Sequence, residues 1–135
     1  MPSNEINYEM RQHALAAAEM VRAEYGHELD FSEATIGAVE AILNGFWQEG
    51  EPADEFFLKV ALLFGSYIGE VIRESFPDAA WAESVPDSET SEPSIKLADI
   101  EVFPLTWCYK RLVNGPDDSV VKKYLEFRKE IDSRA

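Results

Sequence analysis

Basic residues, cysteine and long apolar runs are all scarce in this sequence. The 12 lysines and arginines are outnumbered by 26 acidic residues, which gives a formal net charge of −14 at pH 7. Such a surface repels the phosphate backbone, so no binding of nucleic acid is expected. The longest uncharged run, residues 60–69, is about half of the ~20 residues that a membrane span needs, so no membrane insertion is expected either.

The use of cysteine and the character of the N-terminus predict a cytoplasmic protein. Cys108 is the single cysteine and cannot form an internal disulfide, which is typical of a reducing compartment. The first ten residues are polar and acidic, unlike a signal or transit peptide. With 135 residues, of which 46% are apolar, the chain can bury a core without disulfides or metals. We expect a single domain over residues 1–135.

Motifs for metal binding, phosphate binding and covalent catalysis are also missing. His13 and His27 are isolated, and no second cysteine is present to complete a zinc pattern. Gly-Ser-x-x-Gly at residues 65–69 differs from the Gly-x-Ser-x-Gly nucleophile elbow and falls inside a predicted helix. No glycine-rich phosphate loop occurs. We therefore expect no enzymatic activity, no metal and no cofactor.

Apolar periodicity predicts three helices, then three short strands, then two helices. Helical spacing governs the chain up to Pro77, strand-like alternation follows it, and helical spacing returns at Pro104. The predicted helices cover 5–25, a segment capped by Ser32 that includes Phe46, Pro52 to about Ser75, 104–113, and Asp118 or Ser119 to about Asp132. The predicted strands cover 79–85, 94–97 and 100–103. This is an α+β fold of about five helices, with a small three-stranded antiparallel sheet inserted between the third and fourth helices.

The third predicted helix contains two glycines and a carboxylate in the apolar stretch LFGSYIGEVI, residues 63–72. Apolar side chains cover most of its circumference, which predicts a position at the centre of the fold. Gly65 and Gly69 each cost about 1 kcal/mol relative to alanine in a helix. Their spacing indicates that another helix or a strand approaches closely inside the domain. A groove for a ligand or for a second copy of the chain is the alternative, so monomer and homodimer both stay open.

Glu70 shares the narrow polar strip of this helix with Ser66 and Arg73. One interpretation is an ion pair with Arg73, three residues away, at a solvated edge. The other is a partly buried carboxylate beside Tyr67 that binds a cationic group or acts as a base. In that case we expect a pocket between the third helix and the sheet, lined by Glu70, Tyr67 and Trp81.

Acidic residues are concentrated before residue 110. Residues 1–109 hold 21 acidic and five basic residues, whereas residues 110–135 hold five acidic and seven basic ones. Eight of the acids lie within 74–101, where Lys96 is the only base. Such a patch would steer a basic partner protein toward it, although acidity that only maintains solubility is the alternative. The predicted binding residues are Tyr67, Glu70, Trp81, Glu83, Asp87, Glu89 and Glu92.

The second half of the chain resembles a group of small bacterial proteins of unknown function. They share a helix with the pattern G-x-Y-x-G-E-V-I, a strand that carries tryptophan, and a proline-started helix with Lys-Arg-Leu and Asn-Gly. The matching residues are Gly65, Tyr67, Gly69, Glu70, Val71, Ile72, Trp81, Pro104, Lys110, Arg111, Leu112, Asn114 and Gly115. The resemblance implies a shared fold and no particular activity. By analogy with small acidic immunity and antitoxin proteins, we expect a bacterial protein-interaction module; the alternative is a small-molecule-binding protein or weak enzyme.

Overall fold

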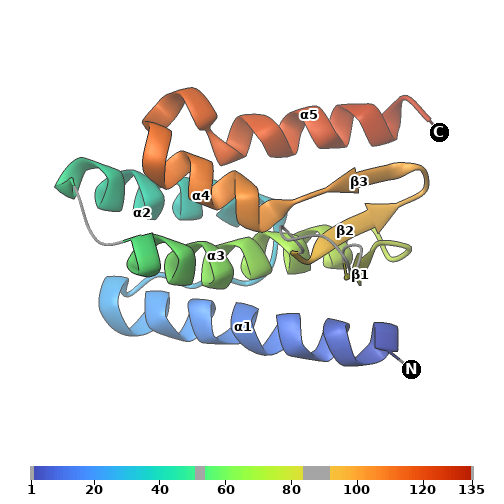
Figure 1. Cartoon of the computed structure of the whole chain (residues 1–135), viewed down its shortest axis with the longest axis horizontal. Coiled ribbons are helices and arrows are strands. Elements are labelled where there is room, and N and C mark those ends of the chain that lie inside the picture. Colours follow the sequence, from blue (N-terminus) through green and yellow to red (C-terminus); the bar gives the residue numbers. More distant parts are fainter. Residues whose placement is uncertain (1, 51–53, 84–91, 135) are drawn as a thin grey trace.

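The computed structural model describes residues 2–50, 54–83 and 92–134, and within them it has five α-helices and three β-strands (Figure 1). The helices are α1 (Pro2–Tyr25), α2 (Ile36–Glu49), α3 (Asp54–Ser75), α4 (Pro104–Asn114) and α5 (Val120–Asp132). The strands are β1 (Ala80–Ala82), β2 (Ser94–Leu97) and β3 (Ile100–Val102). The predicted α+β arrangement, with the sheet inserted between α3 and α4, is confirmed.

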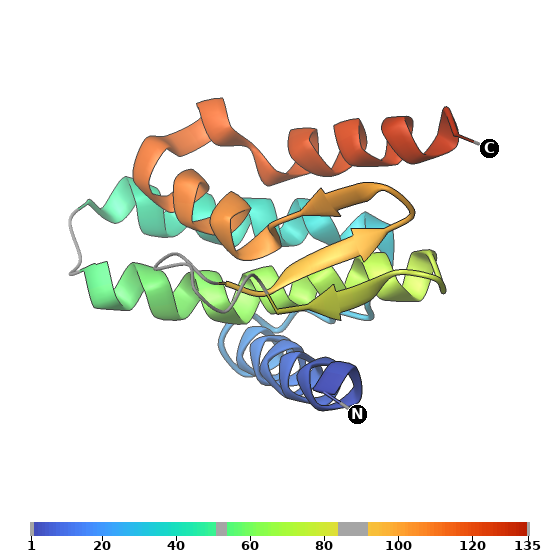
Figure 2. The ribbon, with the colours of Figure 1, turned by 45° about the vertical axis from the view of Figure 1, so that its right-hand side comes forward.

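Helix α3 lies between α1 on one side and α4 on the other (Figures 1 and 2). Every residue from Phe64 to Ile72 is buried, so this part of the helix is covered around its whole circumference. Nearer the start of the helix, Phe56 and Leu58 are 42% and 57% exposed. The central position predicted for this helix is confirmed, but the cover does not reach its first turns.

Gly65 and Gly69 are the points at which other elements come closest to α3. A β-carbon at Gly65 would lie 2.6 Å from Cα of Leu105, in the first turn of α4. At Gly69 it would lie 2.0 Å from Cζ2 of Trp81, on β1. Separations under 3.0 Å essentially never occur for real β-carbons. The two glycines therefore allow close packing inside the chain, as the sequence predicted.

The sheet is antiparallel with strand order β1-β2-β3. Trp81 pairs with Ile95, which also pairs with Val102, so these three side chains share one face of the sheet. This face packs into the hydrophobic core. Lys96 and Glu101 pair on the other face, where both are exposed. The sheet is thus apolar toward the helices and charged toward solvent.

Strand β1 is shorter than the predicted strand over 79–85, and positions 84 and 85 lie outside the described residues. Its backbone meets α1 directly, because the Trp81 N–H donates to Oδ1 of Asn7 at 3.1 Å. The hairpin between β2 and β3 turns at the predicted Ala98-Asp99, with Ala98 at φ 56°. The first part of α1 and the end of α3 are therefore joined through β1.

Most of the described helix ends match the prediction, but α1 begins at Pro2 and not at residue 5, and α2 begins later than predicted. The predicted start of the third helix, Pro52, lies outside the described residues. Helix α1 ends before Gly26, which has φ 64°, and α5 begins after Ser119, whose side chain accepts the N–H of Lys122 at 3.2 Å. Ser32 makes no capping hydrogen bond through its side chain. A 3-10 turn, Glu33–Thr35, separates it from α2, so the predicted N-cap of this helix is wrong.

Candidate functional site

Glu70 is a buried carboxylate with three hydrogen-bond donors around it. Its side chain is 1% exposed. Oε2 accepts from Nε1 of Trp81 and from Nη1 of Arg73, both at 2.8 Å. Oε1 accepts from Nη1 of Arg11 at 3.2 Å. The predicted pair with Arg73 is present, but the carboxylate is buried and does not lie at a solvated edge. The arginines compensate the charge that burial would otherwise penalise.

Arg11 links α1 to this carboxylate and is itself held by several groups. Its Nη1 also donates to Oε1 of Glu74 at 3.3 Å. Its guanidinium carbon lies 4.2 Å from the ring centroid of Phe31, within the range of a cation–π contact. Because α1 packs against α3, an arginine at this position reaches across the boundary between the two helices. The guanidinium therefore has a defined orientation.

A cleft of about 390 Å³ opens between α1 and the last turns of α3. Tyr8 and Glu74 stand at its exposed side, with exposed fractions of 68% and 53%. Arg11 and Arg73 are 34% and 28% exposed. The lining residues are Asn7, Tyr8, Arg11, Glu70, Arg73 and Glu74. The cleft thus offers guanidinium donors, a carboxylate and an aromatic ring within one small volume.

The structure brings together two of the three residues that were expected to line a pocket. Trp81 donates to Glu70, with its ring against α3, and is 1% exposed. Tyr67 lies elsewhere: its hydroxyl accepts the N–H of Phe31 at 2.8 Å and shares a hydrogen bond with Thr35 at 2.6 Å. Burial raises the pKa of Tyr67. The cleft lined by Glu70 therefore lies between α1 and α3, and not between α3 and the sheet.

The predicted acidic binding residues have different environments. Glu83 follows β1 and is exposed. Glu92 is half-buried, and its Oε1 accepts a hydrogen bond from the Thr106 hydroxyl at the start of α4. Asp87 and Glu89 lie outside the described residues. In the part of the chain that is described, the cleft is therefore lined by Glu70 and Glu74, without Glu83 or Glu92.

Sequence reasoning missed Asn7, Tyr8, Arg11 and Glu74 as lining residues. Asn7, Tyr8 and Arg11 lie on α1 and precede Glu70 by 59 or more residues, so no local spacing relates them to it. One signal was available. Arg11 is one of only five bases in residues 1–109, and a scarce cation on an amphipathic helix is a candidate partner for a carboxylate in the core.

A second ionic network joins α2, α4 and α5 around Glu40. Arg111, which is 2% exposed, donates through Nε to Glu40 and through Nη2 to Asn44. Glu40 also accepts from the Ser119 hydroxyl at 2.8 Å and the Val121 N–H at 3.1 Å. Burial opposes the charged form of Glu40, but these donors outweigh it and lower its pKa. This network positions α2, α4 and α5 relative to one another.

Comparison with family models, with curated proteins and with solved structures found no match to this chain. The resemblance to the small bacterial proteins therefore stays a prediction. In residues 2–50, 54–83 and 92–134, no three histidine, cysteine, aspartate or glutamate side chains are grouped as a metal site would need. None of the helices described is both long enough and apolar enough to cross a membrane.

Proposed function

We propose that this protein is a non-enzymatic interaction module that binds a basic partner protein through the acidic surface of residues 74–101. An immunity- or antitoxin-like inhibitor of a cationic protein is the concrete form of this proposal. It is supported by the ion pairs of the described residues, because these leave several exposed acidic side chains of this surface without a basic partner.

All six arginines form ion pairs with acidic side chains of the same chain. Among the described residues, Lys123 is the only lysine in an ion pair. Asp78, Glu83 and Glu101 are exposed, and no basic side chain described lies within ion-pairing distance of them. An acidic field of this kind raises the rate at which a cationic protein meets this surface.

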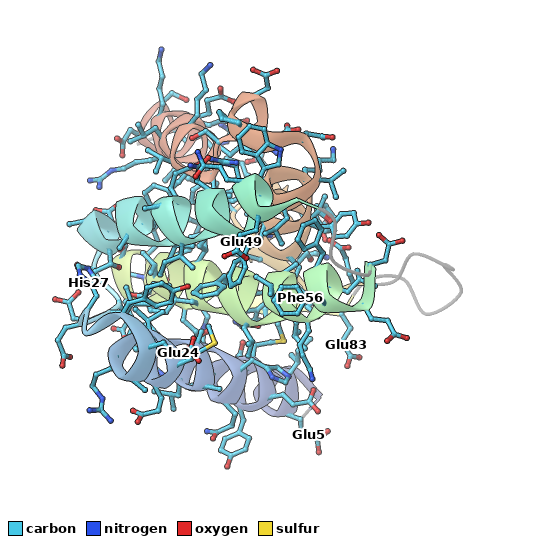
Figure 3. All side chains as sticks on the ribbon, turned by 90° about the vertical axis from the view of Figure 1, so that its left-hand side faces the viewer. Glu5, Glu24, His27, Glu49, Phe56 and Glu83 are labelled. Carbon is cyan, nitrogen blue, oxygen red and sulfur yellow. The ribbon has the colours of Figure 1, made fainter. Side chains whose placement is uncertain are left out.

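The exposed acids around β1 come from more than one element. Glu5 precedes Asn7 on α1, and Glu83 follows Trp81, the residue whose N–H binds Asn7. Both acids project from the same side of the molecule (Figure 3). Asp78 lies in the connection from α3 to β1 and is exposed. A partner that binds here would therefore contact acids from both α1 and the α3–β1 connection.

Charge reversal at matched positions tests this proposal. A partner is isolated by affinity capture, purified, and titrated against the wild type, against D78K/E83K, and against E24K/E49K. Glu24 and Glu49 are exposed and lie at the end of the molecule away from the sheet, and the net charge changes equally in both variants (Figures 1 and 3). D78K/E83K should slow association about tenfold or more, and E24K/E49K should have little effect. Equal effects of the two variants, or a rate that is unchanged between low and high salt, would contradict the proposal.

A second candidate function, binding of a small molecule, is favoured by one observation. Glu70 and two arginines line a cleft of about 390 Å³, within the range of ordinary ligand sites. The site of this second candidate function is separate from the residues changed in the first test, since neither Asp78 nor Glu83 lines the cleft. The two candidate functions can therefore be tested separately.

A further inference from the structure

Two of the five basic residues in the first 109 positions meet at one carboxylate. Arg11 comes from α1 and Arg73 from α3, and both donate to Glu70. The carboxylate already receives three hydrogen bonds in the core, one of them from Trp81. Its oxygens are therefore occupied by donors of the protein itself, and a ligand in the cleft would mainly meet the two guanidinium groups.

Each of the two arginines donates to the carboxylates of Glu70 and Glu74 through only one of its nitrogens. Arg11 and Arg73 both donate through Nη1, and their Nε and Nη2 atoms make no hydrogen bond within the part of the chain that is described. About a third of each side chain is exposed, at 34% and 28%. Two guanidinium groups fixed in this way, with N–H groups to spare, suit the binding of a carboxylate.

The opposite charge is also present in the cleft. Glu74 is 53% exposed and accepts from Arg11 through Oε1 only, among the described residues, so its other oxygen is open to a cationic donor. Tyr8 is 68% exposed and adds an aromatic ring to the lining. Anion-binding, cation-binding and apolar groups thus share one volume.

We propose that this cleft binds a free α-amino acid with an apolar or aromatic side chain. Arg11 and Arg73 bind its carboxylate, Glu74 binds its ammonium group, and its side chain packs against Tyr8. A simple anion would be repelled by a protein with a net charge of −14, whereas a zwitterion has no net charge to repel. This inference names the ligand class for the second candidate function. It uses Glu74 from the acidic surface of residues 74–101, but neither Asp78 nor Glu83, which the charge-reversal test changes.

Three related probes separate the contributions of the two charges. Phenylalanine carries both charged groups, 3-phenylpropionate lacks the ammonium, and phenethylamine lacks the carboxylate. The binding of each probe is measured by calorimetry and by the ¹H–¹⁵N signal of the Trp81 indole. This signal reports on Glu70, because the indole N–H donates a hydrogen bond to the Glu70 carboxylate. Phenylalanine should bind and shift this signal, and each analogue should bind at least about tenfold more weakly. No binding of phenylalanine at millimolar concentration, or equal binding of all three probes, would overturn the proposal.

Variants of exposed residues then assign the groups. E74Q should weaken the binding of phenylalanine about tenfold or more, because the ammonium contact is lost. It should not weaken the binding of 3-phenylpropionate, which has no ammonium group and is repelled by the Glu74 carboxylate. Y8A should weaken the binding of both phenylalanine and 3-phenylpropionate. E24Q, at the other end of α1, serves as the matched control and should change the affinity for neither probe. Since Glu74 and Tyr8 are exposed, these variants should fold. Wild-type affinity in E74Q would overturn the assigned orientation, and it would leave the test of the acidic surface untouched.

Discussion

The indole ring of Trp81 lies directly on the backbone of Gly69. A β-carbon at this glycine would come within 2.0 Å of Cζ2 and 2.3 Å of Cη2 of the indole. The same indole donates to Glu70, so the close approach at Gly69 is also what places the donor beside the carboxylate. The glycine and the acid that stand side by side in the sequence thus depend on one tryptophan from β1.

Replacement of Gly69 by alanine should destabilise the protein. Alanine favours a helix over glycine by about 1 kcal/mol, but the clash with a fully buried ring should outweigh this. We expect a net loss of about 1–3 kcal/mol in the free energy of unfolding, measured by urea titration. G45A is the control, because Gly45 lies in α2 with open space around it, and this variant should be neutral or more stable. A G69A protein as stable as G45A would contradict the packing described.

Replacement of Glu70 by glutamine should remove the charge that Arg11 and Arg73 compensate. The amide keeps the shape of the side chain, but it presents only one acceptor oxygen to three donors. We expect a loss of about 2 kcal/mol in unfolding free energy, which is less than for a fully buried pair because both arginines are partly exposed. The Trp81 indole N–H signal should also move. E74Q, at the exposed end of the same network, should change stability by less than about 0.5 kcal/mol.

The central position of α3 could be predicted because the apolar pattern that indicates it lies within the helix itself. Apolar side chains cover most of the circumference of the helix over residues 56–72, and only a helix surrounded by other elements can bury most of them. The role of the glycines followed from the same stretch. The hairpin at Ala98-Asp99 could be predicted for a similar reason, since two short alternating runs flank a turn.

The burial of Glu70 could not be predicted because its partners are distant in the chain. Arg11 lies 59 positions earlier, and Trp81 reaches the carboxylate only because β1 folds back over α3. Spacing within the helix revealed Arg73 alone, which favoured a surface ion pair. The location of the cleft was missed for the same reason, since half of its lining comes from α1.

Tyr67 should make stability sensitive to high pH. Burial raises its pKa above the ordinary value of about 10, so the unfolded chain loses this proton at a lower pH than the folded protein does. Stability linked to Tyr67 is therefore complete below about pH 10 and is lost as the pH rises through the pKa of the folded state. Y67F should cost about 1 kcal/mol at neutral pH through the lost hydrogen bonds to Phe31 and Thr35. Denaturation curves between pH 8 and 11 should show a shallower decline for Y67F than for wild type; parallel declines would contradict this. Y8F, at an exposed tyrosine, is the control.

Glu40 should contribute stability that acid removes. Its pKa is lowered because the donors around it, Arg111 foremost, outweigh the effect of burial, so the folded protein holds the charged form to a lower pH than the unfolded chain. The contribution is therefore present above the ordinary pKa of a glutamate and is lost as the pH falls through the pKa of the folded state. E40Q leaves the buried Arg111 without its anion, which should cost about 2–3 kcal/mol at pH 7.

The difference in unfolding free energy between E40Q and wild type should shrink as the pH falls below about 4, since the wild-type carboxyl group of Glu40 then also becomes neutral. Urea denaturation from pH 7 to pH 3 measures both curves. Glu28 is exposed and forms no ion pair with a described basic residue, so E28Q controls for the change in net charge and should track wild type throughout. If the E40Q difference stayed constant across this range, the carboxylate of Glu40 would not be the group that holds Arg111 in the folded protein. The joining of α2, α4 and α5 would then rest on apolar packing and on the hydrogen bond from Arg111 to Asn44.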